Sequence, residues 1–138
     1  MRPDTNRLSA TFGGDDLDAS LIQLLELRFL APDDPRFLGT LAAVEAGLRR
    51  GSNMLRYASE DDFGVPHTAF NVCTFWLIEA LHFTGRDDDA RVLLEEMLSR
   101  CTPAGLLSED IDPVSGELWG NYPQTYSLVG MINCAVLL

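Results

Sequence analysis

The sequence predicts an all-α fold in which the helices pack as antiparallel pairs. Three observations support this prediction. Apolar residues recur with helical spacing in five segments, start and stop signals separate the segments, and no stretch alternates convincingly between polar and apolar residues. The chain has 138 residues, of which 46% are hydrophobic, and this is enough for one domain with its own core. We therefore expect a single domain over residues 1–138.

The first two predicted helices are marked by signals at their N-termini. Residues 18–30 carry apolar side chains at helical spacing and begin with an aspartate that can cap the first turn. Residues 35–50 follow Asp34 and begin with Pro35, which is tolerated there because the first N–H of a helix has no intrahelical partner. Gly51 then predicts the end of the second helix.

The other three predicted helices differ in polarity. Residues 68–85 are apolar almost all round, which predicts a helix that is buried on most sides. Residues 87–100 combine apolar and charged positions and should keep one face in water, whereas residues 123–138 are again largely apolar. A buried helix followed by an amphipathic one is typical of the inner and outer helices of a toroid. It is equally typical of a solenoid, so both arrangements remain open.

Charge and hydropathy narrow the classes of function. Ten basic and twenty-one acidic residues give a net charge of −11, which repels phosphate backbones and argues against nucleic-acid binding. The sequence has neither a run of about eighteen apolar residues, as a membrane span needs, nor the apolar core of a signal peptide. We expect a cytoplasmic protein without membrane contact that binds a neutral ligand or a protein partner.

Metal sites are not expected. Asp110 and Asp112 suggest a calcium loop, but Gly116 falls one place later than an EF-hand requires. His67 and His82 share no ligand spacing with each other or with a cysteine. The three cysteines are odd in number and lack paired spacing, so we interpret them as small buried hydrophobic residues.

The segment GLLSEDIDPVSGELWGNYPQ, residues 105–124, separates the last two predicted helices. A structureless connection of about twenty residues is uncommon in a compact domain and is usually functional or disordered. Leu106, Ile111 and Trp119 are too apolar for a solvated linker. We therefore expect this loop to hold functional side chains.

Six motifs occur in a defined order: DLDASL, FLAPDDPRF, TAFNVCTFWLIEAL, TGRDDDARVLLEEML, GLLSEDIDP and GNYPQTYS. In order and spacing they resemble the C-terminal half of bacterial glycoside hydrolase family 15 proteins, which include glucoamylases, trehalases and glucoamylase-like hydrolases. The resemblance covers the chain from about Ser9 onward. It implies an (α/α)6 toroid with an active-site pocket at one end, of which this chain would supply a partial toroid of about five helices in inner and outer pairs.

The resemblance also implies a reaction. Family members hydrolyse α-glucosidic bonds with inversion, and this needs a carboxylic acid and a carboxylate base roughly 6.5–9.5 Å apart. The family's general base lies in the loop that this chain spells GLLSEDIDP, and the matching residue is Glu109. The general acid lies upstream of the matched region, so we expect a C-terminal fragment that is inactive alone. The expected substrate is an α-glucoside or oligosaccharide, and no cofactor is expected.

Several side chains are candidates for contact with the substrate. Trp119 and Tyr122 could stack on the apolar face of a sugar, while Asn121 could donate and accept hydrogen bonds at its hydroxyls. Asp110 is a further candidate and the adjacent competitor of Glu109 for the role of base. In the alternative interpretation, SEDIDP is only a polar turn.

His67 departs from the resemblance, because many family members carry glutamate at its position, beside the pocket. A histidine there changes the charge and hydrogen bonding at this edge of the site. A partial toroid would also expose the apolar flanks of its helices, so we expect self-association or pairing with a missing N-terminal half. The alternative functions are a non-catalytic α-helical module that binds carbohydrate or protein, and a solenoid scaffold.

Overall fold

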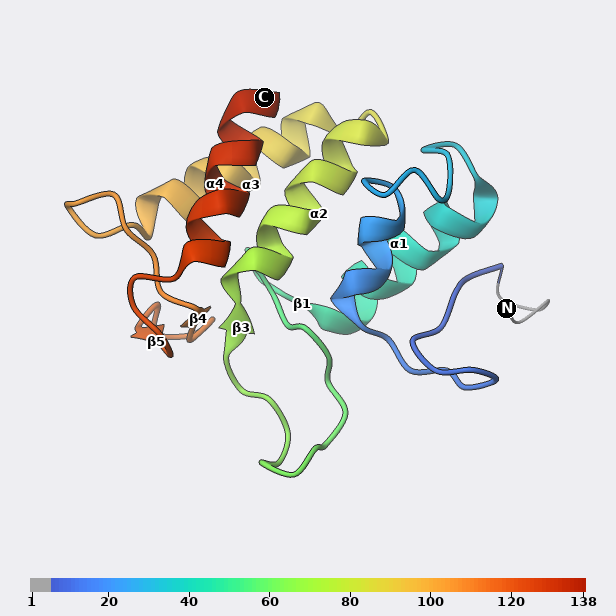
Figure 1. The fold of residues 1–138 in the computed structure, drawn as a ribbon, viewed down its shortest axis with the longest axis horizontal. Coiled ribbons are helices and arrows are strands. Elements are labelled where there is room, and N and C mark those ends of the chain that lie inside the picture. Colours follow the sequence, from blue (N-terminus) through green and yellow to red (C-terminus); the bar gives the residue numbers. More distant parts are fainter. Residues whose placement is uncertain (1–5) are drawn as a thin grey trace.

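The computed structural model describes residues 6–138 and confirms a mainly helical chain. In chain order the helices are the 3-10 helix η1 (Ala19–Leu24) and the α-helices α1 (Pro35–Leu48), α2 (Asn71–Phe83), α3 (Asp87–Ser99) and α4 (Thr125–Leu137). Helix α2 lies in the middle of the molecule and packs against η1, α3 and α4 (Figure 1). The most apolar segment of the sequence therefore has neighbours on several sides.

Helix α1 begins where its sequence predicts. The Asp34 side chain accepts a hydrogen bond of 2.8 Å from the N–H of Arg36, and Pro35 occupies the first turn. The helix ends at Leu48, two residues earlier than expected, because the next two residues form a short strand. The chain then turns at Gly51, whose φ of +61° is a conformation that glycine adopts without strain.

The helix expected over residues 18–30 is wrong in type and length. Asp18 does cap it, since its side chain accepts a hydrogen bond of 2.8 Å from the N–H of Ser20, but η1 is a 3-10 helix that ends at Leu24. The following residues form turns, and Arg28 adopts a left-handed φ of +57° that no helix can continue through. The side chains of Leu27 and Phe29 are consequently exposed to solvent, at 72% and 70%.

Five short strands accompany the helices in the described residues, although no stretch of the sequence alternates convincingly. The short strands are β1 (Arg49–Arg50), β2 (Asn53–Met54), β3 (Ala69–Phe70), β4 (Asp110–Ile111) and β5 (Leu118–Trp119). One antiparallel sheet pairs β1 with β2, and a second has the order β3-β4-β5. Each strand has two residues, which is too short to reveal alternation in a sequence. The second sheet orders part of the expected loop and lies where β3 leads into α2 (Figure 1).

The described helices differ in burial as their sequences predict. Nine of the thirteen residues of α2 are buried, whereas α3 buries four of its thirteen. This difference agrees with an inner position for α2 and an outer position for α3. Cys73 and Cys134 are buried and unpaired, and burial raises the pKa of both thiols, which fits small core residues.

Helix α4 presents an apolar stripe to solvent, formed by Tyr126, Val129, Ile132 and Val136. These positions follow one another at three- and four-residue spacing and therefore share one side of the helix. Val136 is 83% exposed. Within residues 6–138, no helix combines the length and the apolar character needed to cross a membrane.

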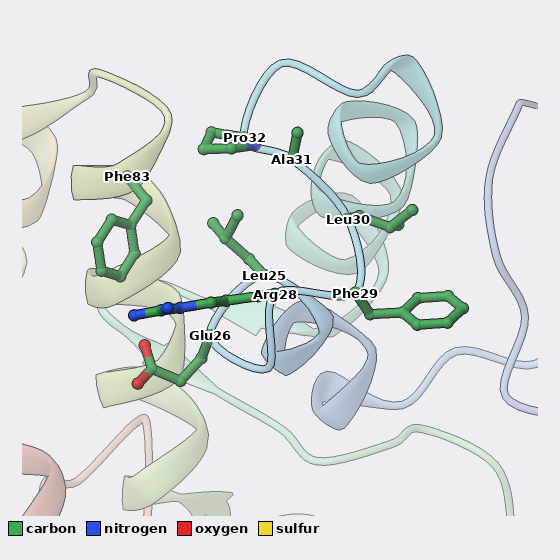
Figure 2. A pocket seen from close by; sticks show the side chains of 8 residues that line it. All are labelled: Leu25, Glu26, Arg28, Phe29, Leu30, Ala31, Pro32 and Phe83. Atoms are coloured by element: carbon green, nitrogen blue, oxygen red, sulfur yellow. The ribbon is translucent and has the colours of Figure 1, made fainter.

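A depression of about 460 Å³ lies near the C-terminal end of α2. Its lining residues are Leu25, Glu26, Arg28, Phe29, Leu30, Ala31, Pro32 and Phe83. Figure 2 shows Arg28 reaching toward α2 between Glu26 and Phe83. Since α2 is thirteen residues long, this depression is separated by most of the helix from the loop that carries the candidate carboxylates.

Candidate active site

The three-stranded sheet separates buried side chains from side chains that face outward. Ala69, Ile111 and Leu118 occupy paired positions, and the first two are fully buried. Phe70, Asp110 and Trp119 occupy the alternate paired positions. Side chains directly opposite each other in an antiparallel pair lie on the same face, so these three share the outward face.

A second cavity, of about 260 Å³, opens beside this face. It is lined by Arg56, Tyr57, Pro66, Thr68, Phe70, Glu109 and Asp110. Two of the sequence-predicted site residues, Glu109 and Asp110, therefore contribute to one cavity. It also contains an arginine and two aromatic side chains, which are groups that can bind a neutral polyhydroxylated ligand.

The backbone of Glu109 is held from two sides. Its N–H donates a hydrogen bond of 2.8 Å to the carbonyl of Asn121, and its own carbonyl accepts one of 3.0 Å from the N–H of Asn71. Asn71 is the first residue of α2. The backbone position of Glu109 is thus fixed by the start of a buried helix and by the far end of its own loop.

The preceding residue, Ser108, is held by both apolar helices. Its carbonyl accepts hydrogen bonds of 3.0 Å from Nδ2 of Asn71 and of 2.7 Å from Oγ of Ser127 in the first turn of α4. All three residues are buried. Because buried hydrogen bonds are costly to break, this arrangement resists displacement of the Glu109 backbone.

The Glu109 carboxylate has two unlike oxygens. Oε2 accepts hydrogen bonds of 3.2 Å from the N–H and of 2.9 Å from Nδ2 of Asn121. Across residues 6–138, no hydrogen bond involves Oε1. The carboxylate therefore keeps one oxygen that can accept a proton from a water or a ligand.

Asp110 has a different environment. Its side chain accepts a hydrogen bond of 2.8 Å from Oγ1 of Thr68 and is half-buried. Burial raises the pKa of this carboxyl, and the negative charge of Glu109 raises it further, while the Thr68 hydrogen bond opposes both effects. The two adjacent carboxylates are thus distinct in solvation and in partners.

Arg56 and Tyr57 line the cavity although the sequence did not single them out. Arg56 forms an ion pair of 3.4 Å with Asp18, the residue that caps η1. The Tyr57 hydroxyl donates a hydrogen bond of 2.5 Å to Asp61, which raises the pKa of the tyrosine and lowers that of the aspartate. Asp61 belongs to the stretch SEDD of residues 59–62, which follows both residues in the sequence but does not by itself indicate a cavity.

The four other predicted residues lie outside the cavity lining. Trp119 is 52% exposed and Tyr122 is 51% exposed. The Tyr122 hydroxyl lies 3.1 Å from Oγ1 of Thr102, and His67 is exposed between two residues that do line the cavity. Asn121 contacts Glu109 instead of the open cavity.

The sequence raised Asp112 as a possible calcium ligand, but one oxygen of its carboxylate already accepts hydrogen bonds from backbone N–H groups. Its Oδ1 accepts hydrogen bonds of 2.7 Å from the N–H of Val114 and of 3.2 Å from the N–H of Ser115. These donors lower the pKa of Asp112. In the part of the chain that the structure describes, no three His, Cys, Asp or Glu side chains are grouped so that they could hold a metal ion.

Comparison with solved structures gives the class of fold. The chain matches a structure titled "Glycosidase Wild Type" with a TM-score of 0.82 at 21% identity, over 96% of this chain and 38% of that one. A glycosidase variant in complex with glucose gives a TM-score of 0.81 at 20% identity, with the same coverage. The described fold is therefore one that glycosidases contain.

The family follows from the sequence. The family model "Glycosyl hydrolases family 15" matches residues 2–136, so the chain belongs to that family and the expected membership is confirmed. A trehalase of Mycobacterium tuberculosis is 38% identical over 128 residues, which are 91% of this chain and 19% of that protein. A trehalase of Thermoplasma volcanium is 38% identical over 133 residues, covering 96% of this chain and 21% of that protein. The chain thus spans about a fifth of the length of these relatives.

Proposed function

We propose that Glu109 is the general base in the inverting hydrolysis of an α-glucosidic bond, within a family 15 domain that is larger than this chain. One observation carries the proposal. The Glu109 carboxylate lines a cavity with one oxygen held by Asn121, while the other accepts no hydrogen bond from residues 6–138. A fixed carboxylate with a free oxygen is what a general base requires.

In the proposed reaction Glu109 removes a proton from a water molecule. The water oxygen attacks the anomeric carbon from the face opposite the leaving oxygen, and a carboxylic acid roughly 6.5–9.5 Å from the base protonates that oxygen. Asp110 is the adjacent residue and its side chain bonds Thr68, so we assign the acid to a part of the domain outside this chain. Because general acid catalysis contributes about 10²–10⁴-fold, the chain alone should be nearly inactive.

We propose trehalose as the substrate, since the similar curated proteins are trehalases. The disaccharide is neutral, so it avoids repulsion by the negative charge of the chain. Arg56 is placed in the cavity lining where its guanidinium can donate hydrogen bonds to sugar hydroxyls, and Trp119 and Tyr122 are exposed where a ring could stack. His67 is assigned to the outer edge of this surface.

A chimera tests the proposal. This chain replaces the matching 133 residues of the Thermoplasma volcanium trehalase, and glucose release is measured from trehalose, maltose and isomaltose. We expect hydrolysis of trehalose, and a loss of at least about 10²-fold in kcat for Glu109→Gln because the amide cannot accept the proton. Asp110→Asn serves as the matched control and should lose much less. Equal losses for the two variants, or unchanged turnover in Glu109→Gln, would contradict the assignment.

A non-catalytic module that binds carbohydrate is the second candidate. The exposure of Trp119, which is paired with the lining residue Asp110, favours it, because a stacking ring serves binding without hydrolysis. This candidate predicts that the chain alone binds trehalose in a calorimetric titration and that the chimera turns nothing over. Turnover in the chimera that depends on Glu109 excludes it.

We further propose that the exposed apolar stripe of α4 packs against another part of a family 15 domain. The matching glycosidase structure contains this fold within a chain more than twice as long, so residues are present there that could cover such a stripe. Self-association of this chain is the competing use of the same surface, since exposed apolar patches usually mark contacts.

A further inference from the structure

We infer that Asn121 is a positioning residue for the Glu109 carboxylate and not a contact to the sugar. The inference rests on the proposed role of Glu109 as the general base. An asparagine in this loop could serve sugar hydroxyls, and the sequence alone favours that role. The structure instead directs its backbone N–H and its side-chain Nδ2 at a neighbouring carboxylate.

Three hydrogen bonds join the two residues. The Glu109 N–H donates to the Asn121 carbonyl at 2.8 Å, and the Asn121 N–H and Nδ2 both donate to Oε2 of Glu109, at 3.2 Å and 2.9 Å. The backbone bond sets the distance between the residues, and the other two set the orientation of the carboxylate. Hydrogen bonds to an ionised acceptor are stronger than neutral ones, so they favour one orientation of this side chain.

Gly120 gives independent support for the same contact. Its φ is +76°, and a Cβ atom at this position would lie 3.0 Å from both Cβ and Oε2 of Glu109. Any larger residue would push the loop away from the carboxylate. The glycine therefore allows the backbone N–H of Asn121 to approach Oε2 closely.

The two oxygens of the Glu109 carboxylate have different roles. The backbone N–H and Nδ2 of Asn121 both donate to Oε2, and Oε1 accepts no hydrogen bond from residues 6–138, so Oε1 is the oxygen that takes the proton from water. Asn121 suits this task because its amide is a neutral donor. An aspartate of the same shape would have no N–H in its side chain and would repel Glu109.

The chimera distinguishes positioning from sugar contact. For Asn121→Ala we expect kcat to fall about tenfold or more while KM changes less than about twofold, because a charge-assisted hydrogen bond is lost from the base and not from the substrate. Asn121→Asp, the isosteric variant, should lose more than Asn121→Ala. A raised KM with unchanged kcat in Asn121→Ala, or wild-type turnover in Asn121→Asp, would overturn the inference.

The variants distinguish a wrong role for Asn121 from a wrong role for Glu109. If Glu109→Gln keeps full turnover, the general-base assignment itself fails. If Glu109→Gln loses turnover but Asn121→Ala raises only KM, Glu109 remains the base and only the positioning role of Asn121 is lost.

A spectroscopic measurement on this chain tests the contact between Asn121 and Glu109 without requiring catalytic activity. The side-chain amide ¹H–¹⁵N signal of Asn121 should differ between the wild-type chain and Glu109→Gln, because the substitution replaces the carboxylate oxygen to which Nδ2 donates. The amide of Asn53 is the control, because it contacts the sulfur of Met97. An Asn121 signal that is the same in the wild-type chain and in Glu109→Gln would overturn the inference.

Discussion

Ser127 in the first turn of α4 donates a 2.7 Å hydrogen bond from its hydroxyl to the carbonyl of Ser108, the residue before Glu109. Both residues are buried, and the same carbonyl accepts a second hydrogen bond from Asn71 at the start of α2. The loop that carries the proposed base is thus connected to two helices whose starting residues are 54 positions apart, Asn71 and Thr125.

Ser127→Ala should destabilise the chain by about 1 kcal/mol, because it removes one buried hydrogen bond while the Ser108 carbonyl keeps the other. Thermal and urea unfolding measure this loss. Ser20→Ala, at an exposed position of η1, is the matched control and should change the free energy of unfolding by less than about 0.5 kcal/mol. An unchanged midpoint in Ser127→Ala would show that the hydrogen bond does not stabilise the loop.

Gly130→Ala should destabilise the chain by about 1–3 kcal/mol through overpacking. A Cβ atom at Gly130 would lie 2.8 Å from Cβ of Phe75, which is fully buried and cannot move aside. Gly47→Ala is the matched control within α1, because its Cβ would meet only the terminal Cδ1 of Leu17, at 2.7 Å. Urea unfolding of both variants should show the larger loss for Gly130→Ala, and a reversed order would contradict the close contact between α2 and α4.

Glu79→Gln should stabilise the chain at pH 8 relative to the wild type and have little effect near pH 4. Burial, then the negative charge of Glu26, raises the pKa of Glu79 from 4.5 to about 7, while a hydrogen bond from Asn133 opposes the rise. A carboxyl with a raised pKa binds its proton more tightly in the folded state. The stability that this proton confers is present at low pH and is lost as the pH rises from 4.5 through about 7.

The size of this effect is at most about 1–3 kcal/mol, since one pKa unit corresponds to 1.36 kcal/mol and Glu79 retains some contact with water. Urea unfolding at pH 4 and pH 8 gives the difference. Glu95→Gln, at an exposed position of α3, is the control. Equal effects of Glu79→Gln at both pH values would contradict the buried environment.

Val136→Lys should reduce association of the chain without unfolding it. Val136 is 83% exposed on the apolar stripe of α4, and a positive charge near a helix C-terminus is favourable. Val114→Lys is the control, because it removes a valine that is 95% exposed from a loop. Sedimentation velocity over a range of concentrations should show weaker association only for Val136→Lys, and a monomeric wild-type chain would exclude self-association through this stripe.

The sequence predicted those parts of the fold that depend on local signals. Asp34 and Pro35 marked the start of α1 because capping and the first-turn tolerance of proline act within a few residues. The prediction of a helix over residues 18–30 was wrong because apolar spacing does not reveal that Arg28 adopts a left-handed backbone conformation. The strands β3, β4 and β5 were missed because each has only two residues, and because β3 pairs with a strand about forty residues further along the chain.

In the candidate site, too, some features have local signals in the sequence and others depend on contacts between distant segments. The loop of residues 105–124 could be found from its length and composition, and the resemblance pointed to Glu109 within it. The hydrogen bonds from Asn121 to Glu109, and the position of Arg56 in the same cavity, depend on how separate segments meet. Residue types alone could not predict these contacts, and Trp119 and Tyr122 could not be assigned to the inside or the outside of the cavity.

The Ser108 carbonyl accepts hydrogen bonds from both α2 and α4, so the position of its loop depends on the order in which these helices pack. Helix α4 must dock before Ser127 can reach Ser108, so an intermediate with only α2 in place would hold this part of the loop through Asn71 alone. Amide protons near Glu109 should then exchange with solvent at the rate at which α4 detaches. The loop would take its final position late in assembly, when α4 docks.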